Sequence, residues 1–91
     1  MDRQLHIYYS GTVQGVGFRF TAERIGASLG LGGWVKNLRD GRVEVLCVGK
    51  ESAIKEFLRK MEDAFKEYIR DSDVEWNEPT GEYIGFDIKF D

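Results

Sequence analysis

The pattern of apolar positions at the start of the chain changes its period at Phe18. Between residues 5 and 9 alternate positions are apolar, which predicts a strand that ends near residue 11. A glycine-rich loop follows over residues 11–17. From Phe18 to Leu29 apolar residues recur at helical spacing, and Gly30 then supplies a C-terminal stop. The pattern therefore predicts a strand, a loop and a helix, in that order.

A hairpin and a second helix are predicted next. Residues 33–38 and 42–48 have strand patterns, and the Asp40-Gly41 pair between them favours a tight turn. Residues 51–69 have helical periodicity, with charged residues opposite an apolar stripe. That stripe consists of Ile54, Phe57, Leu58, Met61, Phe65 and Tyr68. We expect it to pack on the sheet.

Two further strand signals complete the predicted fold. They cover residues 74–76 and 86–90, with a turn at Pro79-Thr80-Gly81 between them. The element order is β-α-β-β-α-β, with room for one extra short strand. Two amphipathic helices must then cover one face of a mainly antiparallel sheet, which is the two-layer, ferredoxin-like α+β sandwich. We expect one domain over residues 1–91. Because this fold hosts many functions, it does not by itself define an activity.

Charge and composition narrow the possible functions. Residues 1–61 contain ten basic and six acidic side chains, whereas residues 62–91 contain three basic and ten acidic ones. Nucleic-acid binding needs a basic excess, so we expect no nucleic-acid partner, while a small anionic ligand remains possible. One Cys and one His cannot build the usual zinc site, and no apolar run approaches a membrane span. We expect a single cytoplasmic domain that is a monomer.

The loop before the first helix has the composition of an anion site. Gly15 and Gly17 lack Cβ and can adopt backbone angles that let successive N–H groups converge. The helix start adds unpaired N–H groups and positive dipole charge. Arg19, in the first helical turn, could bind two phosphate oxygens through its planar guanidinium. A tight strand-to-helix turn with an exposed arginine is an equally simple interpretation of these residues alone.

Four segments of the chain stand out as motifs: Val13-Gln14-Gly15-Val16-Gly17-Phe18-Arg19, Gly33-Trp34-Val35-Lys36-Asn37, Asp40-Gly41-x-Val43-Glu44-Val45 and Pro79-Thr80-Gly81-Glu82. They resemble the motifs of the acylphosphatase family, and the resemblance covers essentially the whole chain. The resemblance implies hydrolysis of carboxyl-phosphate anhydrides without metal or cofactor. It also implies that the phosphate is bound by Thr12, Val13, Gln14, Gly15, Val16, Gly17, Phe18 and Arg19. Arg19 and Asn37 would be catalytic, with Asn37 positioning the attacking water. The substrate partner would be a small-molecule acyl phosphate.

The sequence departs from the family pattern at three positions. Thr12 stands where many members have Lys or Arg, Gly17 where some have Cys, and Leu38 where some have a polar residue. These departures concern affinity and rate rather than the class of reaction. No general acid accompanies the motif, which suits a carboxylate leaving group whose conjugate acid has a pKa of about 4.

Two other functions remain as alternatives. The first is a phosphate- or carbamoyl-phosphate-binding module with little turnover, which the presence of Asn37 disfavours. The second is a ferredoxin-like RNA-binding domain, which would need exposed aromatic residues on central strands and a basic face. We assign His6 a structural or surface role, Cys47 a buried position and Asp40 a role in the turn. For Trp34 we favour packing, and Lys36 could either add positive potential near the site or be solvated.

Overall fold

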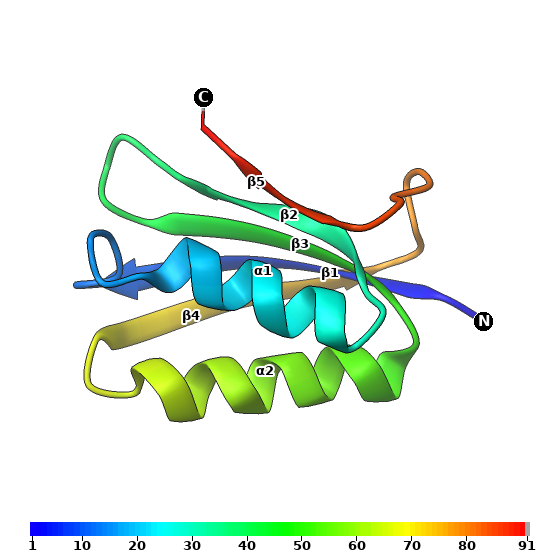
Figure 1. Ribbon diagram of the computed structural model, residues 1–91, viewed down its shortest axis with the longest axis horizontal. Helices are drawn as coiled ribbons and strands as arrows, with labels where there is room; N and C mark the ends of the chain where they lie inside the picture. Colours follow the sequence, from blue (N-terminus) through cyan, green and yellow to red (C-terminus); the bar gives the residue numbers. More distant parts are fainter. Residues whose placement is uncertain (91) are drawn as a thin grey trace.

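Two helices cover one face of a five-stranded sheet in the computed structural model, which describes residues 1–90 (Figure 1). The strand order is β4-β1-β3-β2-β5, and every neighbouring pair is antiparallel except β2 with β5. This is the predicted ferredoxin-like arrangement with the extra strand added at one edge. The elements are β1 (Arg3–Gly11), α1 (Phe18–Ser28), β2 (Gly32–Asn37), β3 (Val43–Gly49), α2 (Glu51–Phe65), β4 (Ile69–Asn77) and β5 (Phe86–Lys89).

The core lies between the helices and the inner face of the sheet. Ile7 on β1 pairs with Val45 on β3, and both side chains are fully buried, as the strand alternation predicts. The stripe of α2 covers these strands through Ile54, Phe57, Met61 and Phe65. Gly26 of α1 is needed for close approach, because a Cβ there would lie 2.5 Å from the Phe86 ring.

The end of α2 differs from the prediction. The helix ends at Phe65, not at residue 69, because the backbone N–H of Tyr68 closes a turn on the Phe65 carbonyl at 2.8 Å. Tyr68 is therefore not part of the buried stripe and is 42% exposed. Ile69 already belongs to β4, where it pairs with Gly11.

β4 is also longer than the three residues that the pattern indicates. It runs from Ile69 to Asn77 and pairs with β1 along its length. Its outer-face residues Asp71, Asp73 and Glu75 are exposed and charged, so the alternation that marks a half-buried strand is weak. As an edge strand it tolerates these charges, which also discourage pairing with other chains.

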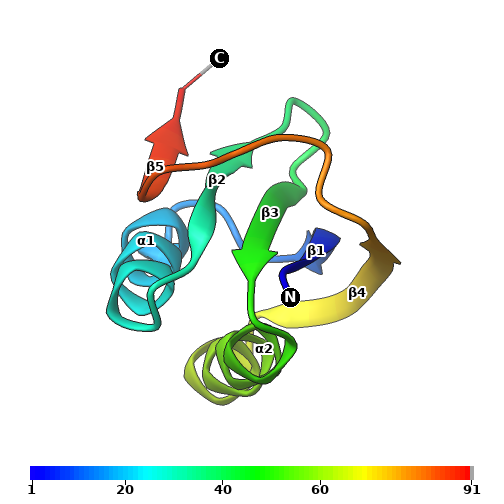
Figure 2. The ribbon, with the colours of Figure 1, turned by 90° about the vertical axis from the view of Figure 1, so that its right-hand side faces the viewer.

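The connection over residues 78–85 passes on the side of the sheet away from the helices (Figure 2). Thr80 is fixed there because its backbone N–H and its hydroxyl both donate to Gln4 Oε1, each at 3.0 Å. The segment lies at the opposite end of the sheet from residues 12–17 (Figure 1). Within residues 1–90 neither helix has the length and apolar character needed to cross a membrane.

Candidate active site

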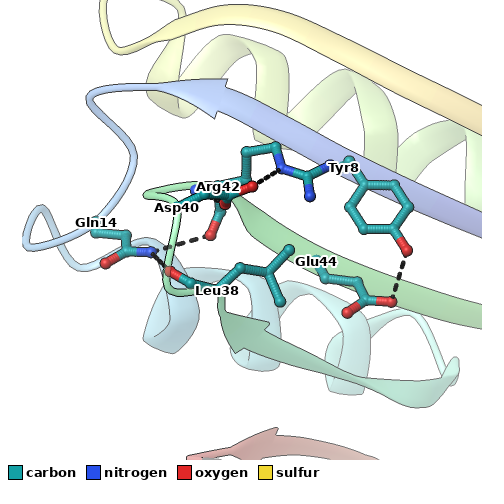
Figure 3. A network of polar contacts seen from close by, with 6 residues as sticks. All are labelled: Tyr8, Gln14, Leu38, Asp40, Arg42 and Glu44. Atoms are coloured by element: carbon teal, nitrogen blue, oxygen red, sulfur yellow. Dashed lines mark hydrogen bonds and ion pairs between the residues drawn. The ribbon is translucent and has the colours of Figure 1, made fainter.

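The loop over residues 12–17 is fixed at its start and in its middle. The backbone N–H of Thr12 donates to the Tyr68 carbonyl at 2.9 Å. Gln14 Nε2 donates to two carbonyl oxygens of the β2–β3 turn, that of Leu38 at 2.7 Å and that of Arg42 at 3.0 Å (Figure 3). The side chain of Gln14 therefore joins the loop to the hairpin.

The two loop glycines adopt conformations that other residues rarely take. Gly15 and Gly17 both have φ near 79°, and a Cβ at either position would meet no atom within 4 Å. The requirement for glycine is therefore conformational, not a matter of space. Gly17 is also the N-cap of α1, and no side chain caps this helix. The N–H groups of its first turn are thus left for another acceptor.

A small pocket of about 150 Å³ opens at this loop. It brings together Arg19 from the first turn of α1 and Asn37 from the last position of β2. Its lining consists of Val13, Gly15, Gly17, Phe18, Arg19, Phe20 and Asn37. Only one of these residues, Arg19, is charged, so the pocket suits a small anion.

Asn37 has an unusual environment in this pocket. Its Oδ1 atom is buried and forms no hydrogen bond with any group of residues 1–90. Buried polar atoms nearly always have a partner, and the exceptions often mark functional positions. A carboxamide oxygen in this setting can accept a hydrogen bond from a water molecule or from a bound ligand.

The guanidinium of Arg19 packs against an aromatic ring that is distant in the sequence. Its guanidinium carbon lies 5.1 Å from the centroid of the Phe90 ring, a cation–π distance. Among residues 1–90, no carboxylate forms an ion pair with Arg19. Sequence reasoning missed Phe90, since only its place on a predicted strand was visible and no local signal linked it to Arg19.

The predicted phosphate-binding residues divide into two groups. Val13, Gly15, Gly17, Phe18 and Arg19 line the pocket. The other three do not line it: Thr12 is exposed, Gln14 binds the hairpin, and Val16 packs against the core.

A larger hollow of about 580 Å³ lies at the other end of the molecule. Its lining includes Gly30, Gly49, Lys50 and Ile84, but neither Arg19 nor Asn37. The small pocket is the better candidate for chemistry, because it holds the guanidinium, the unpartnered carboxamide oxygen and the glycine loop together.

The only histidine and the predicted packing residues lie on the outer face of the sheet. His6 Nε2 and Glu44 Oε2 are 2.6 Å apart, and the rings of His6 and Trp34 lie nearly perpendicular with their centroids 6.2 Å apart. Lys36 Nζ lies 3.9 Å from Glu44 and 5.5 Å from the centre of the Trp34 ring. Neither His6 nor Lys36 lines the pocket. Lys36 thus belongs to this outer cluster and not to the pocket.

Two predicted structural roles agree with the structure. Cys47 is fully buried, and burial raises the pKa of its thiol well above the ordinary range. Asp40 accepts hydrogen bonds from the Arg42 backbone N–H at 3.1 Å and from Arg42 Nε at 2.8 Å. Both hydrogen bonds hold the pKa of the Asp40 carboxyl below its usual value, and the one from the backbone N–H has the larger effect. Within residues 1–90, no three His, Cys, Asp or Glu side chains gather as metal ligands.

The fold and this pocket define a small ferredoxin-like domain with an anion site at its first strand-to-helix junction. Comparison with known proteins makes the assignment specific. A family model described as acylphosphatase matches residues 5–88. An acylphosphatase from Roseiflexus sp. (strain RS-1) is 40% identical over 84 residues, which cover 91% of this chain and 90% of the relative. The chain therefore belongs to the acylphosphatase family, which places it among the hydrolases.

Two solved structures agree with this assignment. The crystal structure of acylphosphatase from Bacillus subtilis superposes with a TM-score of 0.88 at 33% identity, covering 96% of this chain and 98% of that one. The structure of T.kodakarensis HypF superposes with a TM-score of 0.83 at 32% identity. In that case 98% of this chain matches only 12% of the much longer protein. The same domain therefore also occurs within a larger chain.

Proposed function

We propose that this protein hydrolyses the carboxyl-phosphate bond of acyl phosphates, giving a carboxylate and inorganic phosphate, without metal or cofactor. The observation that carries the proposal is the shared pocket of Arg19 and Asn37, in which the carboxamide oxygen is buried and has no partner among residues 1–90. Family membership supports the same reaction class.

Arg19 and the loop amides bind the phosphoryl group in this proposal. Phosphoryl transfer depends mainly on positioning and on stabilising the charge of the equatorial oxygens. The guanidinium can donate two parallel hydrogen bonds, and the uncapped first turn of α1 offers backbone N–H groups beside it. Since the loop is fixed by Thr12 and Gln14, these donors are positioned before substrate binds.

Asn37 positions the nucleophile. Its Oδ1 accepts a hydrogen bond from a water molecule, whose oxygen then attacks phosphorus in line with the leaving group. Asn37 ends β2, so its backbone is held by pairing with Val43 of β3. In favourable intramolecular models, orienting the reactants lowers the activation free energy by about 7–11 kcal/mol. Positioning of the water by Asn37 would supply a part of this effect.

The proposed hydrolysis needs neither a general acid nor a general base from the protein. The water oxygen forms a bond to phosphorus while the bond from phosphorus to the acyl oxygen breaks, and that electron pair leaves on the carboxylate. A carboxylate needs no protonation to leave, since its conjugate acid has a pKa of about 4. The proton of the water passes to a phosphoryl oxygen. Asn37 takes no proton, because a carboxamide is not basic at neutral pH.

A phosphate- or carbamoyl-phosphate-binding module with little turnover is the second candidate. The similarity to a 12% segment of HypF favours it, because there the domain is one part of a larger protein. The acidic strand β4 beside His6 and Tyr8 of β1 argues against an RNA-binding surface.

Hydrolysis of benzoyl phosphate after chelator treatment tests the proposal. The parent should hydrolyse benzoyl phosphate. Arg19→Ala and Asn37→Ala should each lower kcat by about 100-fold or more, which is the effect that removal of a group stabilising the transition state has in other enzymes. Arg24→Ala, on the exposed side of the same helix, is the matched control and should behave like the parent. Full activity in the Arg19 or Asn37 variant would refute the assigned roles. Phosphate binding by a parent without turnover would favour the module.

A further inference from the structure

The pocket is small compared with sites that enclose a whole organic ligand. Its volume of about 150 Å³ compares with roughly 300–1,000 Å³ for pockets that enclose organic ligands. A phosphoryl group held by Arg19 and the loop amides would fill the inner part of the pocket. A bulky acyl group would then extend to the mouth of the pocket, against residues that the phosphate does not use.

Two large, exposed apolar side chains neighbour Arg19, one in the pocket lining and one against its guanidinium. Phe20 lines the pocket next to Arg19 and is 66% exposed. Phe90 lies over the Arg19 guanidinium and is 79% exposed. A single exposed apolar side chain is ordinary on a protein surface, but two phenylalanines beside one arginine of a binding pocket form a local apolar rim. We call these two residues the phenylalanine rim.

The charges around the pocket also favour an apolar acyl group. Arg19 is the only charged residue of the lining, and the phosphoryl group occupies it. An acyl group with its own carboxylate or second phosphate finds no further cation among the lining residues. An acetyl group is too short to cover a phenyl ring. A bulky apolar acyl group, in contrast, can lie against the rim and remove apolar surface from water.

We propose that the phenylalanine rim is an acyl-group subsite, and that it selects acyl phosphates with bulky apolar acyl groups over acetyl phosphate. Phe20 is its main residue, because it lines the pocket directly. This inference rests on the proposed function, since a subsite for the acyl group has meaning only if acyl phosphates are substrates.

The test compares benzoyl phosphate with acetyl phosphate as a ratio of kcat/KM values. The ratio corrects for any general effect of a substitution on the pocket. Covering about half of a phenyl ring contributes enough apolar burial to change affinity roughly fivefold. Phe20→Ala should therefore lower the benzoyl-to-acetyl ratio about fivefold, chiefly through KM for benzoyl phosphate. Phe20→Leu, which keeps an apolar side chain, should recover most of the parental ratio.

Ile84→Ala serves as the matched control, because Ile84 is 97% exposed and lies in the distant hollow. Its ratio should equal that of the parent. Phe20 is largely exposed, so its substitution should leave the protein folded. A parental ratio in an active Phe20→Ala variant would overturn the acyl subsite while leaving the hydrolase intact. A parent that hydrolyses neither substrate would overturn the proposed function and the subsite with it.

Discussion

The two hydrogen bonds of Gln14 are the most consequential contacts between the loop and the hairpin. Gln14 Nε2 donates to the carbonyl oxygens of Leu38 and Arg42, and Leu38 directly follows Asn37 in the chain (Figure 3). Replacing Gln14 with Met keeps the length of the side chain and removes both donors. We expect this variant to be less stable and a poorer catalyst.

The loss of stability follows from the partners that remain. A hydrogen bond contributes a net of about 0.5–1.5 kcal/mol. After the substitution, the Leu38 carbonyl still accepts from Gly41 N–H at 3.2 Å, and the Arg42 carbonyl still accepts from Leu38 N–H at 2.8 Å. Neither oxygen is left without a partner, so the loss is that of two ordinary hydrogen bonds, a total of about 1–3 kcal/mol. In a domain of this size, each kcal/mol lowers Tm by roughly 4–8 °C.

The catalytic loss follows from geometry. Without the bridge, the hairpin that carries Asn37 can shift relative to the loop that binds phosphate. Because a displacement of about 1 Å can cost two orders of magnitude in rate, we expect kcat to fall at least tenfold. The measurements are thermal unfolding of Gln14→Met and its kcat on benzoyl phosphate, beside those of the parent.

Gln4→Met provides the control for this prediction. Gln4 is buried and accepts two hydrogen bonds from Thr80 at the opposite end of β1. Its substitution should lower Tm while kcat stays at the parental value. If Gln14→Met lost stability to the same degree and kept full kcat, the bridge would not position Asn37. An unchanged Tm would mean that the two hydrogen bonds add nothing to stability.

Three further predictions concern the loop, the guanidinium and the turn. Arg19→Lys should lower kcat/KM for benzoyl phosphate about 100-fold, because an ammonium cannot reproduce the planar fork; near-parental kinetics would count against bidentate binding. Gly15→Ala should lower the free energy of unfolding, measured by urea titration, by about 1–2 kcal/mol, because a Cβ at φ 79° strains the backbone without meeting another atom. Gly15→Asn should lower it by less, because asparagine tolerates this conformation better. The pKa of Asp40 is depressed in the fold, so its carboxylate stabilises above about pH 4, and this stability disappears as the pH falls through the folded-state pKa. Asp40→Asn should therefore have a lower urea midpoint than the parent at about pH 7, and the difference should shrink as the pH falls below about 4. A difference independent of pH would exclude the charged form of Asp40 as its source.

The elements that the sequence predicts well are those whose periodicity comes from the core. β1 and α1 agree with the prediction because each has one face packed against the other layer. β4 was predicted as a short strand because both of its faces are largely exposed, so no alternation marks its ends. Its length is set by pairing with β1, which is a tertiary effect.

The candidate site shows the same division between local and distant signals. The loop glycines and Arg19 lie within five positions of one another, so their backbone freedom and charge are enough to suggest an anion site there. Asn37 lies eighteen positions further on and was identified only through the resemblance to a family. The side chain of Gln14 contacts the hairpin, and Phe90 meets Arg19 only in the folded chain. The expected binding of phosphate by the backbone N–H groups of the loop stays a prediction. Such contacts depend on strand pairing and have no local sequence signal.

The proposed placement of a water molecule against phosphorus can be tested by following its oxygen. Benzoyl phosphate hydrolysed by this protein in ¹⁸O-labelled water would be analysed by mass spectrometry of both products. Attack at phosphorus, with the phosphoryl group bound by Arg19 and the water oriented by Asn37, predicts the label in inorganic phosphate and none in benzoate. Label in benzoate would show attack at the acyl carbon and would contradict the mechanism built on this pocket.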